Sequence, residues 1–83
     1  LEKLPTTIYY DGLCQLCSRE IDHYKKNPAS HQIRFVDITH KDFNAIQEGL
    51  DPFAVHKAMH VKTSAGEIKT GVDAFRTIWQ VLP

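Results

Sequence analysis

Residues 8–17 read Ile8-Tyr9-Tyr10-Asp11-Gly12-Leu13-Cys14-Gln15-Leu16-Cys17 and contain both cysteines of the chain. The apolar, aromatic run at the start of this stretch favours a strand, and Asp11-Gly12 is typical of a turn. The residues that follow Cys17 carry apolar side chains at helical spacing. The sequence therefore predicts a Cys-x-x-Cys pair at a strand-to-helix junction, which is typical of a redox dithiol.

The predicted place of the two sulfurs, near a helix N-terminus, favours ionisation of a thiol. Unsatisfied N–H groups and the positive end of the helix dipole lie there, and both stabilise a thiolate. An ordinary cysteine is only a few per cent thiolate near pH 7, whereas a cysteine in such a setting can have a pKa of roughly 3.5–7.5. A nucleophilic cysteine is the expected consequence.

The two cysteines are predicted to have different roles. Cys14 lies nearer the start of the helix, while Cys17 shares a stripe with Ile21 and Tyr24 that should face the core. We therefore expect Cys14 to attack a disulfide and a buried Cys17 to resolve the mixed disulfide. The alternative is a structural disulfide, but closing a loop of about four residues stabilises a fold by only roughly 2 kcal/mol.

Asp11 is the third candidate site residue. Its carboxylate is expected to cap the turn by accepting backbone N–H groups between Gly12 and Cys14. The functional alternative is that Asp11 takes the proton of Cys17 during resolution, or that its charge tunes the dithiol by raising a thiol pKa. The two roles are compatible.

The rest of the chain predicts an alternation of strands and helices. We expect a helix of about 12 residues that ends at Asn27-Pro28, and then a strand over residues 33–38. A short helix should follow between a Thr39 cap and Gly49, with Phe43, Ile46 and Leu50 as its apolar stripe. A hairpin that turns at Ser64-Ala65-Gly66 then leads to a last helix, which is capped by Asp73 and carries Phe75, Ile78, Trp79 and Leu82 on one face. The order β-α-β-α-β-β-α predicts an α/β fold with a mixed four-stranded sheet flanked by helices, as in thioredoxin-like domains.

Two segments of the chain resemble the signatures of one family. Residues 10–17 are similar to the YDGxCxxC opening of the DCC family of predicted thiol-disulfide oxidoreductases, and residues 66–75 resemble its second, glycine-containing signature. The resemblance runs from about Thr7 to Pro83. It implies a thioredoxin-like fold and a dithiol/disulfide activity, with Asp11, Cys14 and Cys17 as the matching signature residues.

Length and composition limit the remaining possibilities. Eighty-three residues suit a single domain over 1–83. Family members tend to continue beyond the last helix, which suggests a domain trimmed at its C-terminus. Ten basic residues balance ten acidic ones, which argues against nucleic acid, and no apolar stretch is long enough for a membrane span. Only two cysteines favour a reducing compartment such as the cytoplasm.

Two other classes of function stay open at this stage. Cys14, Cys17, His56 and His60 form a candidate set for a structural zinc module, although 38 residues between the two pairs far exceed the spacing of a classical finger. A non-catalytic thioredoxin-like scaffold that binds a partner chain is the second class. The favoured hypothesis, a thiol-disulfide oxidoreductase, requires no cofactor, and the expected partner of the protein is a disulfide-bearing protein or a small thiol.

Overall fold

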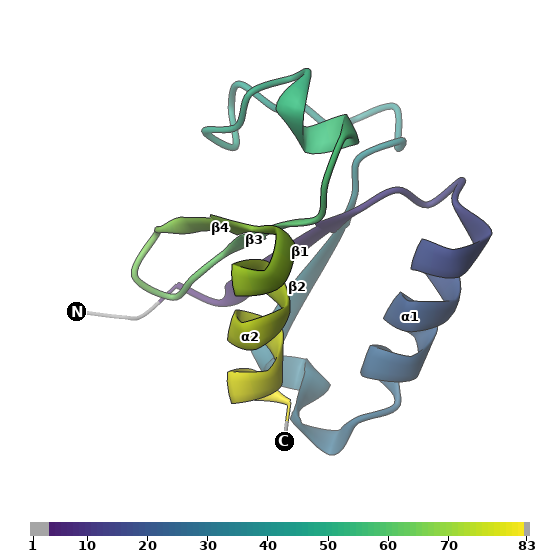
Figure 1. The fold of residues 1–83 in the computed structure, drawn as a ribbon, viewed down its shortest axis with the longest axis vertical. Helices are drawn as coiled ribbons and strands as arrows, with labels where there is room; N and C mark the ends of the chain where they lie inside the picture. Colours follow the sequence, from purple (N-terminus) through teal and green to yellow (C-terminus); the bar gives the residue numbers. More distant parts are fainter. Residues whose placement is uncertain (1–3, 83) are drawn as a thin grey trace.

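A computed structural model describes residues 4–82 of the chain. Its elements are β1 (Thr6–Tyr10), α1 (Gln15–Lys25), the 3₁₀ turn η1 (Pro28–Gln32), β2 (Ile33–Asp37), the 3₁₀ turn η2 (Ala54–His56), β3 (His60–Lys62), β4 (Ile68–Thr70) and α2 (Gly71–Val81), as Figure 1 shows. The predicted domain of 1–83 extends at its ends to residues 1–3 and 83, which lie outside the described residues.

The four strands form one mixed sheet in the order β2-β1-β3-β4. β1 pairs with β2 in parallel, from Thr6 opposite Ile33 to Tyr10 opposite Asp37. β3 pairs antiparallel with both β1 and β4. The predicted α/β class, the parallel β1-α1-β2 unit and the antiparallel hairpin are confirmed, and the arrangement is compatible with a thioredoxin-like fold.

The two faces of the sheet are covered differently. Ile8 of β1 and Val61 of β3 are fully buried against residues of both helices, so α1 and α2 share one face. Tyr9 points to the opposite face and packs there against Ile38, Ala45, Leu50 and Val55. Residues 39–59 thus form a separate layer without an α-helix, seen at the top of Figure 1.

The predicted short helix after Thr39 is wrong. Residues 39–50 form turns, with one helical turn from Asn44 to Glu48 that Gly49 ends in a left-handed conformation (φ +79°). Side chains bond to the backbone in place of a helical ladder, as where Asn44 Oδ1 accepts from Gln47 N at 3.1 Å. Ile46, expected on the buried stripe, is 76% exposed.

The last helix is confirmed, but its start and its buried face differ from the prediction. Thr70, the final residue of β4, is the N-cap, and Gly71 makes the strand-to-helix turn with a φ of +58°. Asp73 lies in the first turn instead of at the cap. Trp79 is 60% exposed, so it does not belong to the buried face.

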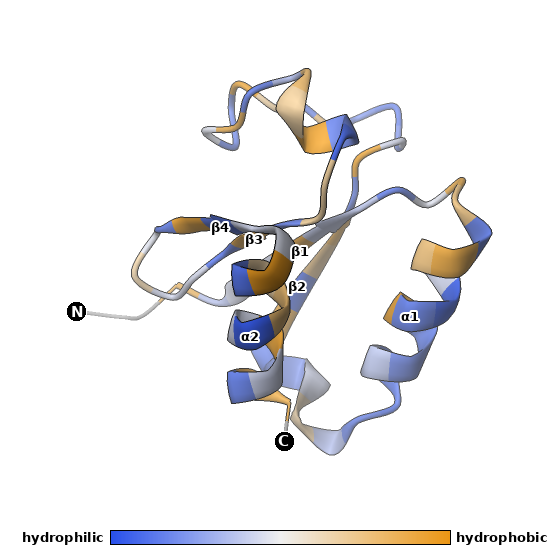
Figure 2. Cartoon of the chain, in the orientation of Figure 1, coloured by the Kyte–Doolittle hydropathy of each residue, from blue (hydrophilic) through white to orange (hydrophobic). Residues whose placement is uncertain are grey.

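Hydropathy changes along α1 from its first turns to its last. Figure 2 shows hydrophobic residues in the first turns of α1 and mostly hydrophilic residues in its later turns. Among residues 4–82, no helix is both long and apolar enough to cross a membrane.

Candidate functional site: the Cys14–Cys17 pair

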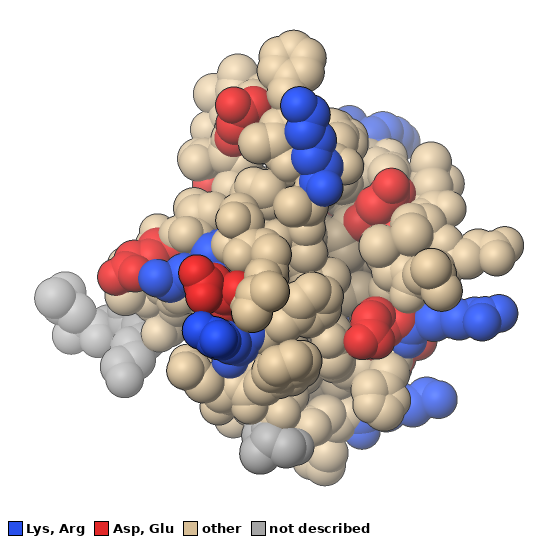
Figure 3. Space-filling view, in the orientation of Figure 1, with Lys and Arg blue, Asp and Glu red and all other residues tan. Residues whose placement is uncertain are grey.

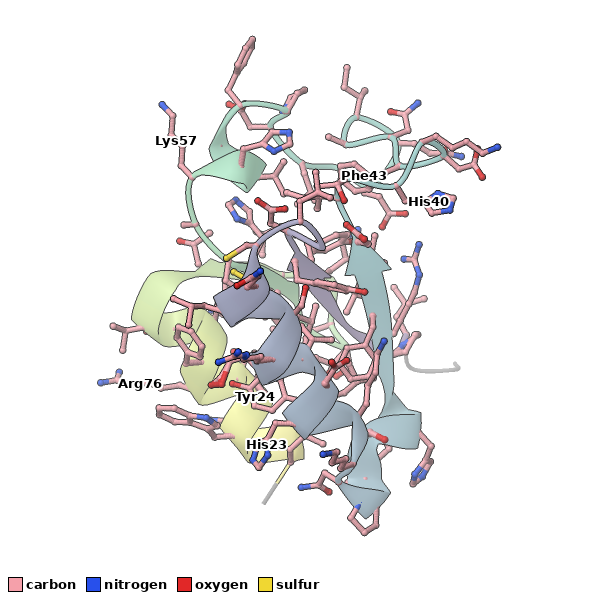
Figure 4. The ribbon with its side chains drawn as sticks, turned by 90° about the vertical axis from the view of Figure 1, so that its right-hand side faces the viewer. His23, Tyr24, His40, Phe43, Lys57 and Arg76 are labelled. Atoms are coloured by element: carbon pink, nitrogen blue, oxygen red, sulfur yellow. The ribbon has the colours of Figure 1, made fainter. Side chains whose placement is uncertain are left out.

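Cys14 is the N-cap residue of α1. Its backbone is extended (φ −84°, ψ 117°), and its Sγ accepts a hydrogen bond from Cys17 N at 3.4 Å. A sulfur thus occupies the position where serine, threonine or aspartate oxygens usually accept the free N–H groups of a helix start. The strand-to-helix junction predicted from the sequence places Cys14 as expected, and in Figure 4 sulfur atoms lie near the start of α1.

The two thiols are shifted in opposite directions. A hydrogen bond from the Cys17 side chain, together with the Cys17 N–H, lowers the pKa of Cys14. The same side-chain hydrogen bond, burial and the nearby charges of Cys14 and Asp11 raise the pKa of Cys17 to about 11. α1 has no acidic residue in its first turn to oppose a thiolate there. Cys14 is therefore the thiol of the pair that ionises first.

The burial of the pair corrects one expectation. Both cysteines are free thiols and both are half-buried, so Cys17 is not the fully buried thiol that its stripe suggested. Ile21 and Tyr24, one and two turns further along α1, do reach the core. Cys17 sits too close to the open start of the helix to be covered.

An apolar cleft of about 400 Å³ opens beside the thiols. Its walls come from the ends of β1, the start of α1, η2 and the residues after it, and α2. The lining residues are Tyr9, Tyr10, Asp11, Cys14, Cys17, Ile38, Val55, His56, Lys57, Ala58, Met59 and Phe75. Lys57 and Asp11 are the lysine and the carboxylic acid residue of this set. Leu13 and Leu16, which directly precede Cys14 and Cys17 in sequence, are 83% and 76% exposed.

Asp11 adopts the expected capping role. Its Oδ1 accepts a hydrogen bond from Leu13 N at 2.9 Å, and its carbonyl accepts from Cys14 N at 3.1 Å. It lines the same cleft as both cysteines, and its charge is one of the causes that raise the pKa of Cys17. The structure thus brings together all three candidate residues of the sequence.

Asp37 is a residue of this site that the sequence pattern did not indicate. Its carboxylate accepts a hydrogen bond from Gly12 N at 3.0 Å, across 25 positions of sequence. The aspartate stands two residues before a threonine at the end of a predicted strand, a spacing that is typical of a turn cap. That signal points to a local role, and only the parallel pairing of β1 and β2 reveals the long-range one.

The candidate zinc ligands are not assembled. His56 lines the cleft together with the cysteines, but the buried His60 is not among the lining residues, and its Nδ1 lies 2.9 Å from the carbonyl of Ala58. Among residues 4–82, no three side chains of His, Cys, Asp or Glu are grouped so that they could hold a metal ion.

The charge distribution agrees with the balanced composition. Figure 3 shows basic and acidic residues interspersed on the face that carries both helices, and Lys69–Glu67 and Arg76–Asp73 contribute pairs of opposite charge at 3.1 and 3.7 Å. A one-signed surface of the kind that attracts a nucleic acid backbone is not seen on this face.

Comparison with known proteins adds a family to this geometry. Residues 8–83 match the family described as DCC1-like thiol-disulfide oxidoreductase. An uncharacterised chloroplastic protein of Arabidopsis thaliana is 37% identical over 73 residues, which cover 86% of this chain and 34% of that protein. The chain thus spans about a third of the length of this relative. No solved structure is significantly similar to the chain.

Proposed function

Since this chain belongs to the DCC1-like thiol-disulfide oxidoreductase family, we propose that it exchanges a Cys14/Cys17 dithiol with the disulfide of a partner molecule. The observation that carries the proposal is the capping of α1 by the sulfur of Cys14, with the pKa of Cys14 lowered and that of Cys17 raised. A thiolate nucleophile beside a protonated second thiol is the arrangement that a directional exchange requires.

The proposed reaction has two displacements. The Cys14 thiolate attacks one sulfur of the partner disulfide, which forms a mixed disulfide and releases the other sulfur as a thiolate. Cys17 then loses its proton and attacks the Cys14 sulfur, which forms the Cys14–Cys17 disulfide and frees the second partner thiol. Two electrons pass to the partner, and an external dithiol reductant returns the pair to its reduced form.

Asp11 is the proposed proton acceptor for Cys17. The carboxylate lines the cleft with both thiols, and Cys17, with a pKa of about 11, needs a base in order to react near neutral pH. Leu13 N donates its hydrogen bond to Oδ1 of Asp11, so we propose that Oδ2 accepts the proton. Capping and proton transfer are then two uses of one side chain.

The proposed substrate is the disulfide of a polypeptide. The cleft beside Cys14 is lined mainly by apolar side chains such as Ile38, Val55, Met59 and Phe75, and the neighbouring Leu13 is largely exposed. Apolar surface of this kind binds apolar residues that flank a cystine. Because the chain has two cysteines and no larger disulfide framework, the proposed location is a reducing compartment such as the cytoplasm.

Reduction of a protein disulfide by the chain in the presence of a dithiol reagent tests this function. Wild-type protein should accelerate the reaction, and Cys14→Ser should remove the acceleration while leaving the far-UV circular dichroism unchanged. If wild-type protein gives no acceleration and its two thiols titrate alike, the chain is a non-catalytic scaffold. Turnover by Cys14→Ser equal to that of wild type would assign the nucleophile elsewhere.

A further inference from the structure

Asp37 lies beside the end of β1, where the chain enters the turn that leads to Cys14. It is the last residue of β2 and pairs in parallel register with Tyr10, the last residue of β1. Ile38 N donates to Tyr10 O at 2.9 Å, so the two strand ends are held together at this point. The turn from Asp11 to Cys14 begins directly beyond it.

One oxygen of the Asp37 carboxylate accepts three hydrogen bonds. The donors are Gly12 N at 3.0 Å, Thr39 N at 2.8 Å and Thr39 Oγ1 at 2.6 Å. Burial by itself would raise the pKa of Asp37, but the hydrogen bonds from Thr39 and Gly12 outweigh it and hold the pKa below its usual value. The side chain is therefore a fixed, ionised acceptor near neutral pH.

Gly12 approaches this carboxylate more closely than any other residue type allows. A Cβ at Gly12 would stand 1.9 Å from Oδ2 of Asp37 and 2.4 Å from its Cγ. Such distances are far inside van der Waals contact. The glycine is needed here because of the Asp37 side chain, whose Oδ2, Cγ and Oδ1 are the three atoms nearest to that position outside the adjoining residues of the chain.

The contact continues from Gly12 to the thiol. Gly12 O accepts from Ser18 Oγ of α1 at 3.1 Å, and Cys14 N donates to Asp11 O at 3.1 Å. The short turn is thus tied to β2 on one side and to the first turns of α1 on the other. Its conformation decides where the sulfur of Cys14 lies relative to Cys17 N.

We propose that Asp37 is a positioning residue for Cys14, which it holds through Gly12 in the place where its sulfur caps α1. This inference rests on the proposed role of Cys14 as nucleophile. Without the acceptor at Asp37, the turn loosens and the sulfur loses part of its hydrogen bond from Cys17 N. The thiolate is then less stable, and Cys14 reacts more slowly near neutral pH.

A role of Asp37 through charge alone has the opposite sign. Removal of a negative charge near a thiol lowers the thiol pKa and makes the thiol more reactive. The other ionisable groups that line the cleft with Cys14 are Tyr9, Tyr10, Asp11, Cys17, His56 and Lys57. Apart from Cys17, all of them are unchanged in the variants that test the proposal. The direction of the change in reactivity therefore separates positioning from charge.

The test is the rate of Cys14 alkylation by iodoacetamide across pH, in a Cys17→Ser background whose hydroxyl keeps a donor beside Cys14. Asp37→Ala should slow alkylation at pH 7 by at least about threefold, because the midpoint of the profile rises. Asp37→Asn retains an acceptor oxygen and should have a midpoint at or slightly below that of the parent. Asp42→Ala is the matched control, because Asp42 is 79% exposed and contacts His40 instead of the turn.

Gly12→Ala is the second variant, because it displaces Asp37 without removing it. It should slow alkylation in the same direction, and it decides the question if circular dichroism shows Asp37→Ala to be unfolded. Alkylation of folded Asp37→Ala at the parent rate or faster would overturn the proposal. Alkylation needs no turnover, so wild-type protein that reduces no disulfide overturns the proposed function and not this inference.

Discussion

The sulfur of Cys14 occupies a position in which a helix start selects for a negative charge. The N–H of Cys17 donates to it at 3.4 Å, and hydrogen bonds from the side chain and the backbone of Cys17 are the largest causes of its lowered pKa. The same geometry keeps Cys17 protonated. The chemistry of the pair therefore follows from which of two neighbouring sulfurs is the N-cap.

The first prediction concerns Asp11. Asp11→Asn should lower the pKa of Cys17 below about 11, because the carboxylate charge helps to raise it, while an amide oxygen can still accept from Leu13 N. The same variant should slow resolution of the mixed disulfide at least about tenfold, because the proton acceptor is lost.

Rapid quenching and mass spectrometry would follow the mixed disulfide of Asp11→Asn with time. Asp22→Asn, an exposed carboxylate on α1, is the control and should resolve at the wild-type rate. Resolution by Asp11→Asn as fast as by wild type would leave capping as the only role of this residue.

Among the elements, the 39–59 layer contains no α-helix, and a single residue, Glu48, links it to three strands of the sheet. Glu48 accepts from Tyr9 Oη at 2.6 Å and from both terminal nitrogens of Arg34 at 3.0 and 2.8 Å. Lys62 donates to the carbonyl of Glu48. One residue of the layer thus contacts β1, β2 and β3.

Stability should therefore depend on Glu48. Hydrogen bonds from Arg34, opposed by burial and aided by Tyr9, lower the pKa of Glu48 from 4.5 to about 2. Since the folded-state pKa is depressed, its contribution is present above about pH 4.5 and is lost as the pH falls towards 2. Because Arg34 is about half exposed, we expect Glu48→Ala to cost about 2 kcal/mol at pH 7.

Urea unfolding at pH 7 and at pH 3 would measure this difference. Glu67→Ala is the control, because Glu67 pairs with Lys69 at an exposed site and its removal should cost less than about 0.5 kcal/mol. A Glu48→Ala cost that is as small as that of Glu67→Ala, or that does not shrink at pH 3, would contradict the account.

The elements that the sequence predicted correctly are those with strong local signals. The strand before the cysteines, the helix after them and the hairpin turn at Gly66 each combine periodicity with a turn residue at the right place. The cysteine pair was placed correctly for the same reason, since a turn between a strand and a helix leaves few alternatives.

The predicted helix between Thr39 and Gly49 does not form, because hydrogen bonds from side chains to the backbone compete there with the helical pattern of apolar residues. A helix of this length is marginal unless packing supports it. Asp37, Asn44 and Asp51 instead bond to nearby backbone N–H groups and stabilise turns. The roles of Asp37 and Glu48 were equally hidden, because Gly12 lies 25 positions from Asp37, and Arg34 and Tyr9 lie 14 and 39 positions from Glu48.

Over the whole molecule, the thiols lie where the layers of the fold meet. The helices cover one face of the sheet, the 39–59 layer packs on the other, and the cleft beside Cys14 takes walls from both sides. A buried apolar core on each face gives the chain a reason to fold without a bound ion.

We therefore predict that the chain folds without metal. Native mass spectrometry should show the mass of the apo chain, and a chelator should leave the far-UV circular dichroism and the melting temperature unchanged. Stoichiometric zinc whose removal unfolds the protein would favour the structural module that Cys14, Cys17, His56 and His60 suggested.

The central claim is that Cys14 attacks and Cys17 resolves, and trapping of the mixed disulfide tests it most directly. Cys17→Ser keeps the nucleophile and removes the resolving thiol, so incubation with a disulfide-bearing polypeptide should accumulate a covalent adduct through Cys14 on non-reducing gels. Cys14→Ser, the matched control, should accumulate none. Equal trapping by the two variants, or trapping by Cys14→Ser alone, would contradict the assignment.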